Sequence, residues 1–159
     1  MPAIRFANET DTPVILGFIR ALAAYEKLEH ECRADEDGLR AHLFGPKPHA
    51  EVLLIEEDGA AHGFALFFHN FSTFLAKPGI YLEDLFVDPA QRGKGYGKAL
   101  LVRLAEIAVE RGCGRLEWSV LDWNKPSIDF YLSLGARPMD EWTIYRLEGS
   151  SLETLASAT

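Results

Sequence analysis

A glycine-rich turn that joins a strand to a long helix is the feature that most constrains how this chain can fold. Residues 87–112 read VDPAQRGKGYGKALLVRLAEIAVERG, and three alternating glycines, Gly93, Gly95 and Gly97, precede an amphipathic run. Each glycine lowers helix stability unless the backbone needs its freedom. A strand, a bare turn and a helix start form an anion-binding site, because unpaired N–H groups and the positive end of the helix dipole point at the ligand. The alternative, a plain tight turn, leaves the three glycines without a use.

The spacing of these glycines excludes two well-known phosphate-binding loops. The Walker A loop requires G-x-x-x-x-G-K-[ST], but Gly97-Lys98 is followed by Ala99, and Arg92 stands where the first glycine belongs. The dinucleotide fingerprint requires G-x-G-x-x-G, whereas the spacing here is G-x-G-x-G and too little chain follows it. The remaining pattern is R-x-x-G-x-G over residues 92–97, which we call the glycine loop.

Charge and composition limit the classes of molecule that this protein is expected to bind. The chain has 159 residues, enough for one domain with one core, and its 16 basic and 24 acidic residues give a formal charge of −8. This balance argues against nucleic acid and suits a cationic small molecule. No signal peptide is evident, and the longest apolar stretch, VILGFIRALAAY, is broken by Arg20 and is too short to span a membrane. Cys32 and Cys113 are isolated and the histidines do not cluster, so we expect no metal, no disulfide framework and a cytoplasmic location.

Hydrophobic periodicity and turn signals predict a mixed α and β order in which most strands precede the long helix. Strands are expected at 3–7, 79–87, 115–121 and 142–149, and a hairpin at 51–71 with Asp58-Gly59 as its turn. Helices are expected at 11–28, 35–45 and 124–135, and a long helix within the stretch 87–112 is expected to end at Gly112. Asp11 or Thr12 and Asn124 are the expected helix caps. We expect one domain over residues 1–149 and a frayed tail over residues 150–159.

The R-x-x-G-x-G pattern resembles the acyl-CoA pyrophosphate loop of the GNAT acetyltransferase superfamily. The preceding YLEDLFVDPAQRGKGYG resembles the family's central strand, and the following WNKPSIDFYLSLGA resembles its N-x-x-x-x-x-x-Y-x-x-x-G segment. Within the superfamily, AAYEKLE, YLEDLFV, RGKGYG and WNKPSIDFY resemble the diamine (spermidine/spermine-type) acetyltransferases, a group that includes thialysine enzymes. The resemblance implies a GNAT α/β fold with a central mixed, mostly antiparallel sheet flanked by helices. It also implies acetyl-CoA as co-substrate and a homodimer.

The same resemblance assigns the cofactor site. The backbone of residues 85–87 is expected to pair with the pantetheine arm as an added strand would; the alternative is that it pairs only with a neighbouring protein strand. The residues expected to bind acetyl-CoA are Leu85, Phe86, Val87, Arg92, Gly93, Lys94, Gly95, Tyr96, Gly97, Lys98, Asn124 and Ser127.

Acetyl transfer from a thioester to an amine requires one proton to be removed and one to be returned. An alkyl amine, with a pKa near ~10.4, is almost fully charged at pH 7, and the departing thiolate leaves better when protonated. The resemblance implies that Tyr131 is the acid and that Glu83 is the base or holds a water. Tyr131 could instead only pack, and Glu83 could be an edge-strand charge that deters aggregation. In a regular strand Glu83 and Asp84 point to opposite faces, so one of them should face a pocket.

The amine site is expected to involve Tyr25, Glu26, Glu83, Asp84 and Glu141, although each carboxylate could equally be solvated. The resulting interpretation is an acetyl-CoA-dependent N-acetyltransferase acting on the primary amine of a small, polyamine- or diamine-like cation. One alternative acetylates an amino acid such as thialysine, or a protein amine. Another is a non-catalytic acyl-CoA-binding module, which would need neither Glu83 nor Tyr131.

Overall fold

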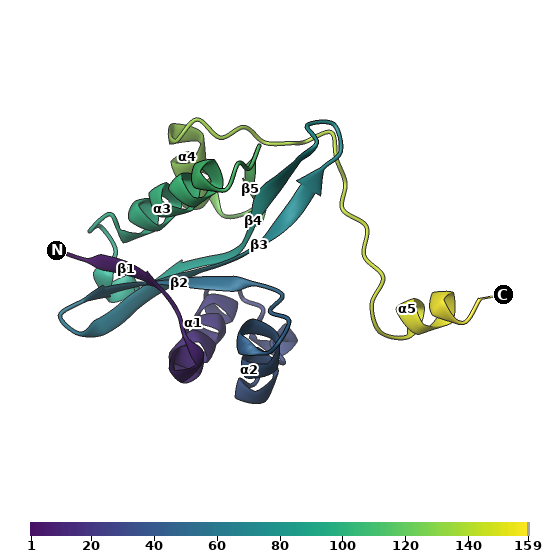
Figure 1. The fold of residues 1–159 in the computed structure, drawn as a ribbon, viewed down its shortest axis with the longest axis horizontal. Helices are drawn as coiled ribbons and strands as arrows, with labels where there is room; N and C mark the ends of the chain where they lie inside the picture. The colour runs from purple at the N-terminus through teal and green to yellow at the C-terminus, as the bar shows by residue number, and fades with distance from the viewer. Residues whose placement is uncertain (159) are drawn as a thin grey trace. The chain divides into compact units, whose positions relative to one another are not determined.

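The computed structural model describes residues 1–158, whose contacts group into two units, Met1–Leu121 and Asp122–Thr159 (Figure 1). The strands are β1 (Ala3–Phe6), β2 (Glu51–Glu57), β3 (Ala60–Ser72), β4 (Lys77–Val87) and β5 (Leu116–Trp118). The helices are α1 (Thr12–Tyr25), α2 (Glu36–Phe44), α3 (Tyr96–Glu110), α4 (Lys125–Ser133) and α5 (Gly149–Ala156), with short 3₁₀ helices at Glu9–Asp11, Glu29–Glu31 and Pro89–Gln91. The single domain expected over residues 1–149 stays a prediction.

The sheet of the first unit follows the chain in the order β1-β2-β3-β4-β5. The first four strands pair antiparallel and β5 pairs parallel with β4, which confirms the mixed, mostly antiparallel sheet. The hairpin between β2 and β3 turns at Asp58 and Gly59, whose φ angles of 54° and 78° are those of a tight two-residue turn. The strands therefore lie in the sheet in the same order as they follow one another along the chain.

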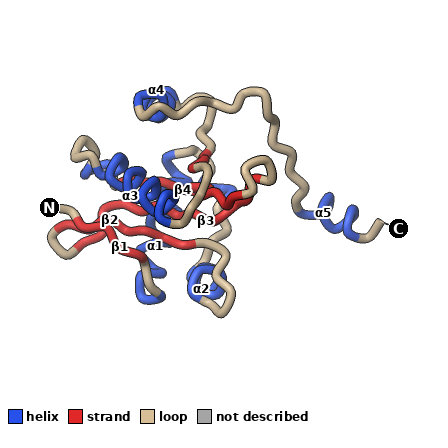
Figure 2. The backbone as a smooth tube through the Cα atoms, turned by 45° about the horizontal axis from the view of Figure 1, so that its top comes forward, coloured by secondary structure: helices blue, strands red, loops and turns tan. Residues whose placement is uncertain are grey.

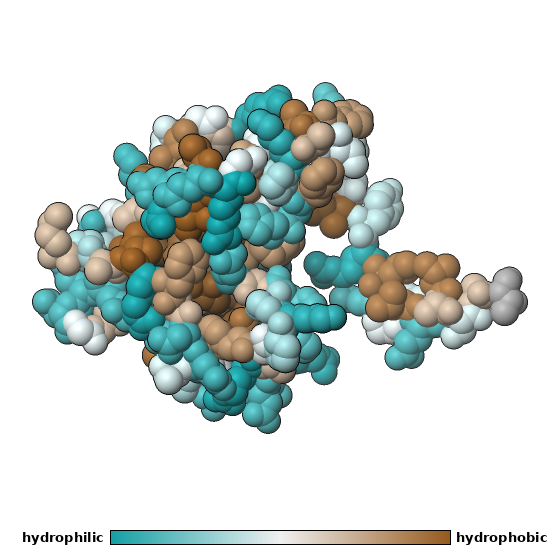
Figure 3. All heavy atoms as spheres, viewed as in Figure 1, coloured by the Kyte–Doolittle hydropathy of each residue, from teal (hydrophilic) through white to brown (hydrophobic). Residues whose placement is uncertain are grey.

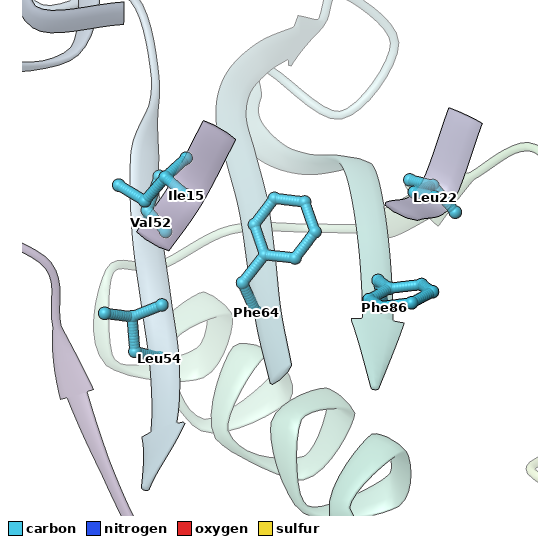
Figure 4. Packing of buried hydrophobic residues seen from close by; sticks show 6 residues of the cluster. All are labelled: Ile15, Leu22, Val52, Leu54, Phe64 and Phe86. Atoms are coloured by element: carbon cyan, nitrogen blue, oxygen red, sulfur yellow. The ribbon is translucent and has the colours of Figure 1, made fainter. Parts of the chain in front are cut away.

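One face of the sheet is covered by α1 (Figure 4). Alternate residues Val52 and Leu54 of β2, with Phe64 of β3 and Phe86 of β4, pack against Ile15 and Leu22 of α1. The Phe18 ring of α1 stacks on Phe64 with 5.6 Å between the ring centroids. Burying such rings completely stabilises the fold, and removing one costs about 3–5 kcal/mol. This packing fixes the end of α1 close to β4, where the site begins.

The opposite face is covered by α3, which lies on the other side of the sheet from α1 (Figures 1 and 2). The buried residues Leu100, Leu104 and Ile107 recur at helical spacing along α3, and the intervening β2 residues Leu53 and Ile55 are equally buried. Because both faces of β2 are covered, its sequence is a continuous apolar run rather than an alternating one.

Local signals at the helix ends are only partly confirmed. Asp35 accepts a hydrogen bond from the Gly38 N–H at 2.7 Å, and Asn124 accepts one from the Ser127 N–H at 3.3 Å. Asp11 does not cap α1 with its side chain, because its carboxylate oxygens each accept a 2.8 Å hydrogen bond from Arg5. The Asp11 carboxylate therefore ties β1 to the start of α1.

One prediction for the C-terminal region is wrong. Residues 142–149 form no strand, because no strand among residues 1–158 pairs with them, and a strand without a pairing partner leaves its N–H and C=O groups to water. Trp142 and Ile144 are accordingly 76% and 78% exposed. Helix α5 lies in this region, its Leu152 and Leu155 are 52% and 60% exposed, and hydrophobic atoms are visible on its surface (Figure 3). The expectation of a frayed tail over residues 150–159 stays a prediction.

Candidate active site

The glycine loop connects β4 to α3 through an exposed turn. Gly93 and Gly95 have φ angles of 86° and 79°, a conformation that disfavours other residues. Gly95 occupies the cap position of α3 and provides no side-chain oxygen, so the first N–H groups of the helix have no side-chain cap. A methyl group added to either glycine would meet no atom within 4 Å. Open space, unpaired donors and the helix dipole fit an anionic group such as a pyrophosphate.

A solvent-exposed groove extends from the glycine loop along α3. It is lined by Ile4, Gly95, Lys98, Ala99, Val102, Arg103 and Glu106. Lys98 therefore lines the same groove as Gly95 of the glycine loop. The groove's apolar residues and Lys98 could hold the rest of a nucleotide-containing ligand, whereas Arg103 pairs with Glu106.

The strand that leads into the glycine loop has an open edge. β4 pairs with β3 through Val87, but it pairs with β5 only over Ile80–Leu82. Among the residues that the structure describes, no strand adjoins β4 on its β5 side beyond Leu82. An extended ligand could add to this edge by main-chain hydrogen bonds. Residues 85–87, expected to bind pantetheine, lie on this free stretch.

The two acidic residues of β4 lie at a β-bulge. Leu66 of β3 is opposite Asp84 and Phe67 is opposite Leu82, so Glu83 is the extra residue without a partner. The expectation of a regular strand at this point is therefore wrong. Glu83 is exposed, whereas Asp84 is partly buried. The assignment of Glu83 as base stays a prediction, and Asp84 is the carboxylate that the fold removes from water.

Three carboxylates, Glu26, Glu83 and Asp84, interact electrostatically, and we call them the acidic group. Burial, followed by repulsion from Glu83 and Glu26, raises the pKa of Asp84 to about 6. Burial also raises the pKa of Glu26, which ends α1 where the helix dipole already disfavours a negative charge. Among the described residues, none of the three makes an ion pair with a lysine or arginine. Such a group favours a cationic ligand, which would relieve the repulsion.

A contact between the glycine loop and α1 brings the anion site next to the acidic group. The Arg92 guanidinium lies over the Tyr25 ring, 5.0 Å from its centroid. Tyr25 packs against the core and directly precedes Glu26. The fold therefore brings Tyr25 close to Arg92, and Glu26 close to Asp84, although each pair is more than fifty positions apart in the chain. The sequence interpretation requires this proximity.

The remaining predicted site residues lie in the second unit. Asn124, buried, caps α4 with its side chain, and Ser127 and Tyr131 lie on this helix, half-buried. The Tyr131 ring contacts Phe130, with 5.7 Å between the ring centroids. Glu141 is exposed in an irregular segment. The roles of these four residues as acid, cofactor ligands and substrate ligand stay predictions.

Sequence reasoning missed Glu57, at the end of β2. Its carboxylate accepts a hydrogen bond from the hydroxyl of Tyr96, the first residue of α3. No local pattern signals this pair, because the two residues are 39 positions apart. Within residues 1–158 no group of three or more histidines, cysteines or carboxylates could hold a metal ion, and no helix is long and apolar enough to cross a membrane.

Comparison with known proteins agrees with this geometry. The model of the acetyltransferase (GNAT) family matches residues 19–136. Thialysine N-epsilon-acetyltransferase of Sus scrofa is 38% identical, with 96% of each chain covered, and L-ornithine N5-acetyltransferase of Arabidopsis thaliana is 35% identical, with 96% of this chain and 86% of that protein covered. An integron cassette protein from the mobile metagenome of V. cholerae has the same fold, with a TM-score of 0.83 and 29% identity over 99% of this chain and 98% of that one. This chain therefore belongs to the GNAT family of acetyltransferases.

Proposed function

We propose that this protein is an acetyl-CoA-dependent N-acetyltransferase that acetylates the primary amine of a small cation by direct attack of the amine on the thioester. The observation that carries the proposal is the open edge of β4, which runs into the glycine loop and also carries two residues of the acidic group, Glu83 and Asp84. The first feature suits an acyl-CoA and the second suits an amine.

In this proposal the acidic group binds the protonated amine and removes its proton. At pH 7 an amine with a pKa near 10.4 is neutral in only about one molecule in a few thousand, a cost of roughly 4–5 kcal/mol. Asp84 and Glu26 attract the ammonium form. Exposed Glu83 then accepts its proton, directly or through a water. The base stands at a bulge, where the strand can aim a side chain away from its regular direction.

In this proposal Tyr131 is the acid that protonates the departing thiolate. Its hydroxyl can return a proton to the departing thiolate, for which a free thiol has a pKa of about 8.5. The side chain is on α4, whose start is fixed by the Asn124 cap. In this proposal the backbone of residues 85–87 and the glycine loop hold the co-substrate, and no metal takes part.

The names of the relatives reorder the candidate amines. Sequence interpretation placed polyamines first, but the relatives with 35–38% identity over most of both chains are named for thialysine and ornithine. Both are amino acids with a terminal side-chain amine. The spermidine/spermine-like relative is 31% identical, and this chain covers 23% of it. We therefore propose a basic amino acid as the first candidate and a polyamine as the second.

A panel of amines separates these possibilities. Purified protein is incubated with acetyl-CoA and one of thialysine, ornithine, lysine, spermidine or putrescine, and release of free thiol is followed. The highest kcat/KM is expected for thialysine or ornithine. A clear preference for spermidine restores the first interpretation. Binding of acetyl-CoA without thiol release above the amine-free control for any amine would instead identify a binding module.

We also propose a cytoplasmic homodimer, as the resemblance implies. Phe71, Phe74 and Leu75 are exposed at the β3–β4 turn, with Phe74 at 96%, and an apolar surface of this kind suits an isologous contact. Light scattering at micromolar concentration tests the proposal. A mass of about 36 kDa, twice the 17.8 kDa chain, is expected, and the monomer mass would contradict it.

A further inference from the structure

The side chain of Tyr96 points away from the open space of the glycine loop and into the protein. The residue is only 3% exposed, and its hydroxyl donates a hydrogen bond to the carboxylate of Glu57. The His62 ring stacks against the Tyr96 ring with 6.1 Å between centroids, and its Nε2 lies 3.1 Å from the backbone oxygen of Glu57. These contacts join the start of α3 to the β2–β3 hairpin.

The glycine loop has little else to hold it at this end. Gly93 and Gly95 carry no side chains, and Lys94 contacts Gln91 and the Tyr96 ring. Glycine has the largest backbone freedom of any residue, and a mobile binding loop must lose that freedom when its ligand binds. Arg92 on Tyr25 holds the first residue of the loop, so Tyr96 is the matching anchor at the other side.

The hydrogen bond between Tyr96 and Glu57 persists at neutral pH. The Tyr96 hydroxyl holds the pKa of the Glu57 carboxyl below its usual value. The carboxylate in turn raises the pKa of Tyr96 to about 12. A neutral phenol therefore donates to an ionised carboxylate, which is a stronger hydrogen bond than one between neutral groups.

We propose that Tyr96 is a positioning residue whose hydrogen bond to Glu57 fixes the turn from the glycine loop into α3, so that the first N–H groups of the helix are already aimed at the pyrophosphate of acetyl-CoA. The inference rests on the proposed acetyl-CoA site, and it gives the Tyr96 and Glu57 side chains a role in holding the loop in place of a contact with the ligand. It also explains why a buried hydroxyl stands between two glycines of an exposed loop.

Tyr96→Phe tests the pair, because it removes the hydroxyl and keeps the ring. The dissociation constant of CoA, measured by calorimetry, is expected to rise about tenfold, within the range of one charge-assisted hydrogen bond. KM for acetyl-CoA should rise in parallel, while kcat at saturation and KM for the amine stay within twofold. Glu57→Ala should weaken CoA binding to the same degree, and the double variant no further, because all three lack the same bond. Glu57→Gln keeps an acceptor oxygen and should retain most of the affinity.

Tyr81→Phe is the matched control, since it removes a tyrosine hydrogen bond of 2.6 Å to Ser119 on a part of the sheet away from the loop. It should leave the CoA dissociation constant unchanged. Hydrogen exchange of residues 92–97 without ligand supplies a readout that does not depend on activity, and Tyr96→Phe should exchange faster there.

The outcomes separate this inference from the proposed function. If wild-type protein binds CoA and Tyr96→Phe binds it within twofold, with unchanged exchange in the loop, the positioning role is refuted. A lower Tm with unchanged CoA affinity also refutes it, because the bond would then serve stability alone. If the wild type does not bind CoA, the proposed function fails and the positioning role fails with it.

Discussion

Gly97 offers a sharp test of the glycine loop, because the unliganded structure has room for a side chain there. It is the second residue of α3 and, unlike Gly93 and Gly95, has no positive φ. A Cβ atom built on it would meet only the Val87 side chain, at 3.9 Å, an ordinary contact distance. A variant at Gly97 is thus not strained by its own fold. Gly95→Asp is a poorer probe, since its positive φ adds backbone strain.

The expected magnitude follows from the backbone approach that glycine permits. A leucine side chain at position 97 would occupy space next to the first N–H groups of α3, where the pyrophosphate is expected. Losing one charge-assisted hydrogen bond there costs about 1.5–3 kcal/mol, which corresponds to roughly a ten- to hundredfold rise in KM for acetyl-CoA. Gly97→Ala should have a smaller effect than Gly97→Leu. Stability should not fall, because replacing a helical glycine stabilises a helix by up to about 1 kcal/mol.

The assay varies acetyl-CoA at saturating amine and follows thiol release, with Tm measured alongside. Gly17→Leu is the matched control: Gly17 is exposed on α1, and a Cβ atom there meets nothing within 4 Å. It should raise Tm slightly and leave KM unchanged. If Gly97→Leu folds normally and keeps the wild-type KM for acetyl-CoA, the assignment of the loop to the pyrophosphate is wrong.

Three further substitutions test the chemistry. Tyr131→Phe should lower kcat by about 10²–10⁴, the usual worth of a positioned acid, with little change in either KM, and full activity would end that assignment. Glu83→Gln should lower kcat/KM for the amine most near pH 7 and less toward the amine's own pKa, where solution supplies the neutral nucleophile; a deficit that does not change between pH 7 and 9.5 would exclude Glu83 as base. Asp84→Asn should raise Tm above pH 6 while weakening amine binding, because the folded-state pKa of Asp84, about 6, lies above its ordinary 3.8, so that its charge destabilises the fold at higher pH. The gain in Tm should vanish below about pH 4, and a gain that persists there would show that charge is not its cause.

Most of the secondary structure could be predicted from the sequence because its signals are local. The tight turn at Asp58-Gly59 and the cap of α4 by Asn124 depend on residues a few positions apart, and each is confirmed. The backbone conformation of the glycine loop is likewise a local property, because glycine readily adopts the positive φ angles found at Gly93 and Gly95. The resemblance to the GNAT family depends on the same short stretches, and the family is confirmed.

The tertiary structure alone decided which side chains meet. The bulge at Glu83 depends on how β4 pairs with β3, so a regular strand was expected and Asp84, not Glu83, became the partly buried carboxylate. Arg111, at the end of α3, makes two hydrogen bonds, of 2.7 and 3.0 Å, to Glu51, sixty positions earlier. A residue pattern reports periodicity along one element and carries no information about its neighbour.

The same distinction explains the wrongly predicted strand at 142–149 and the missed pair of Tyr96 and Glu57. Residues 142–149 have the apolar content of a strand, but a strand forms only where it pairs with another strand, and none of the described strands pairs with this segment. Tyr96 and Glu57 bond because the β2–β3 hairpin ends beside the start of α3. Sequence determines the conformations that a segment prefers, since these arise from neighbours in the chain; packing decides its partners, since these arise from burial of surfaces that lie far apart in the sequence.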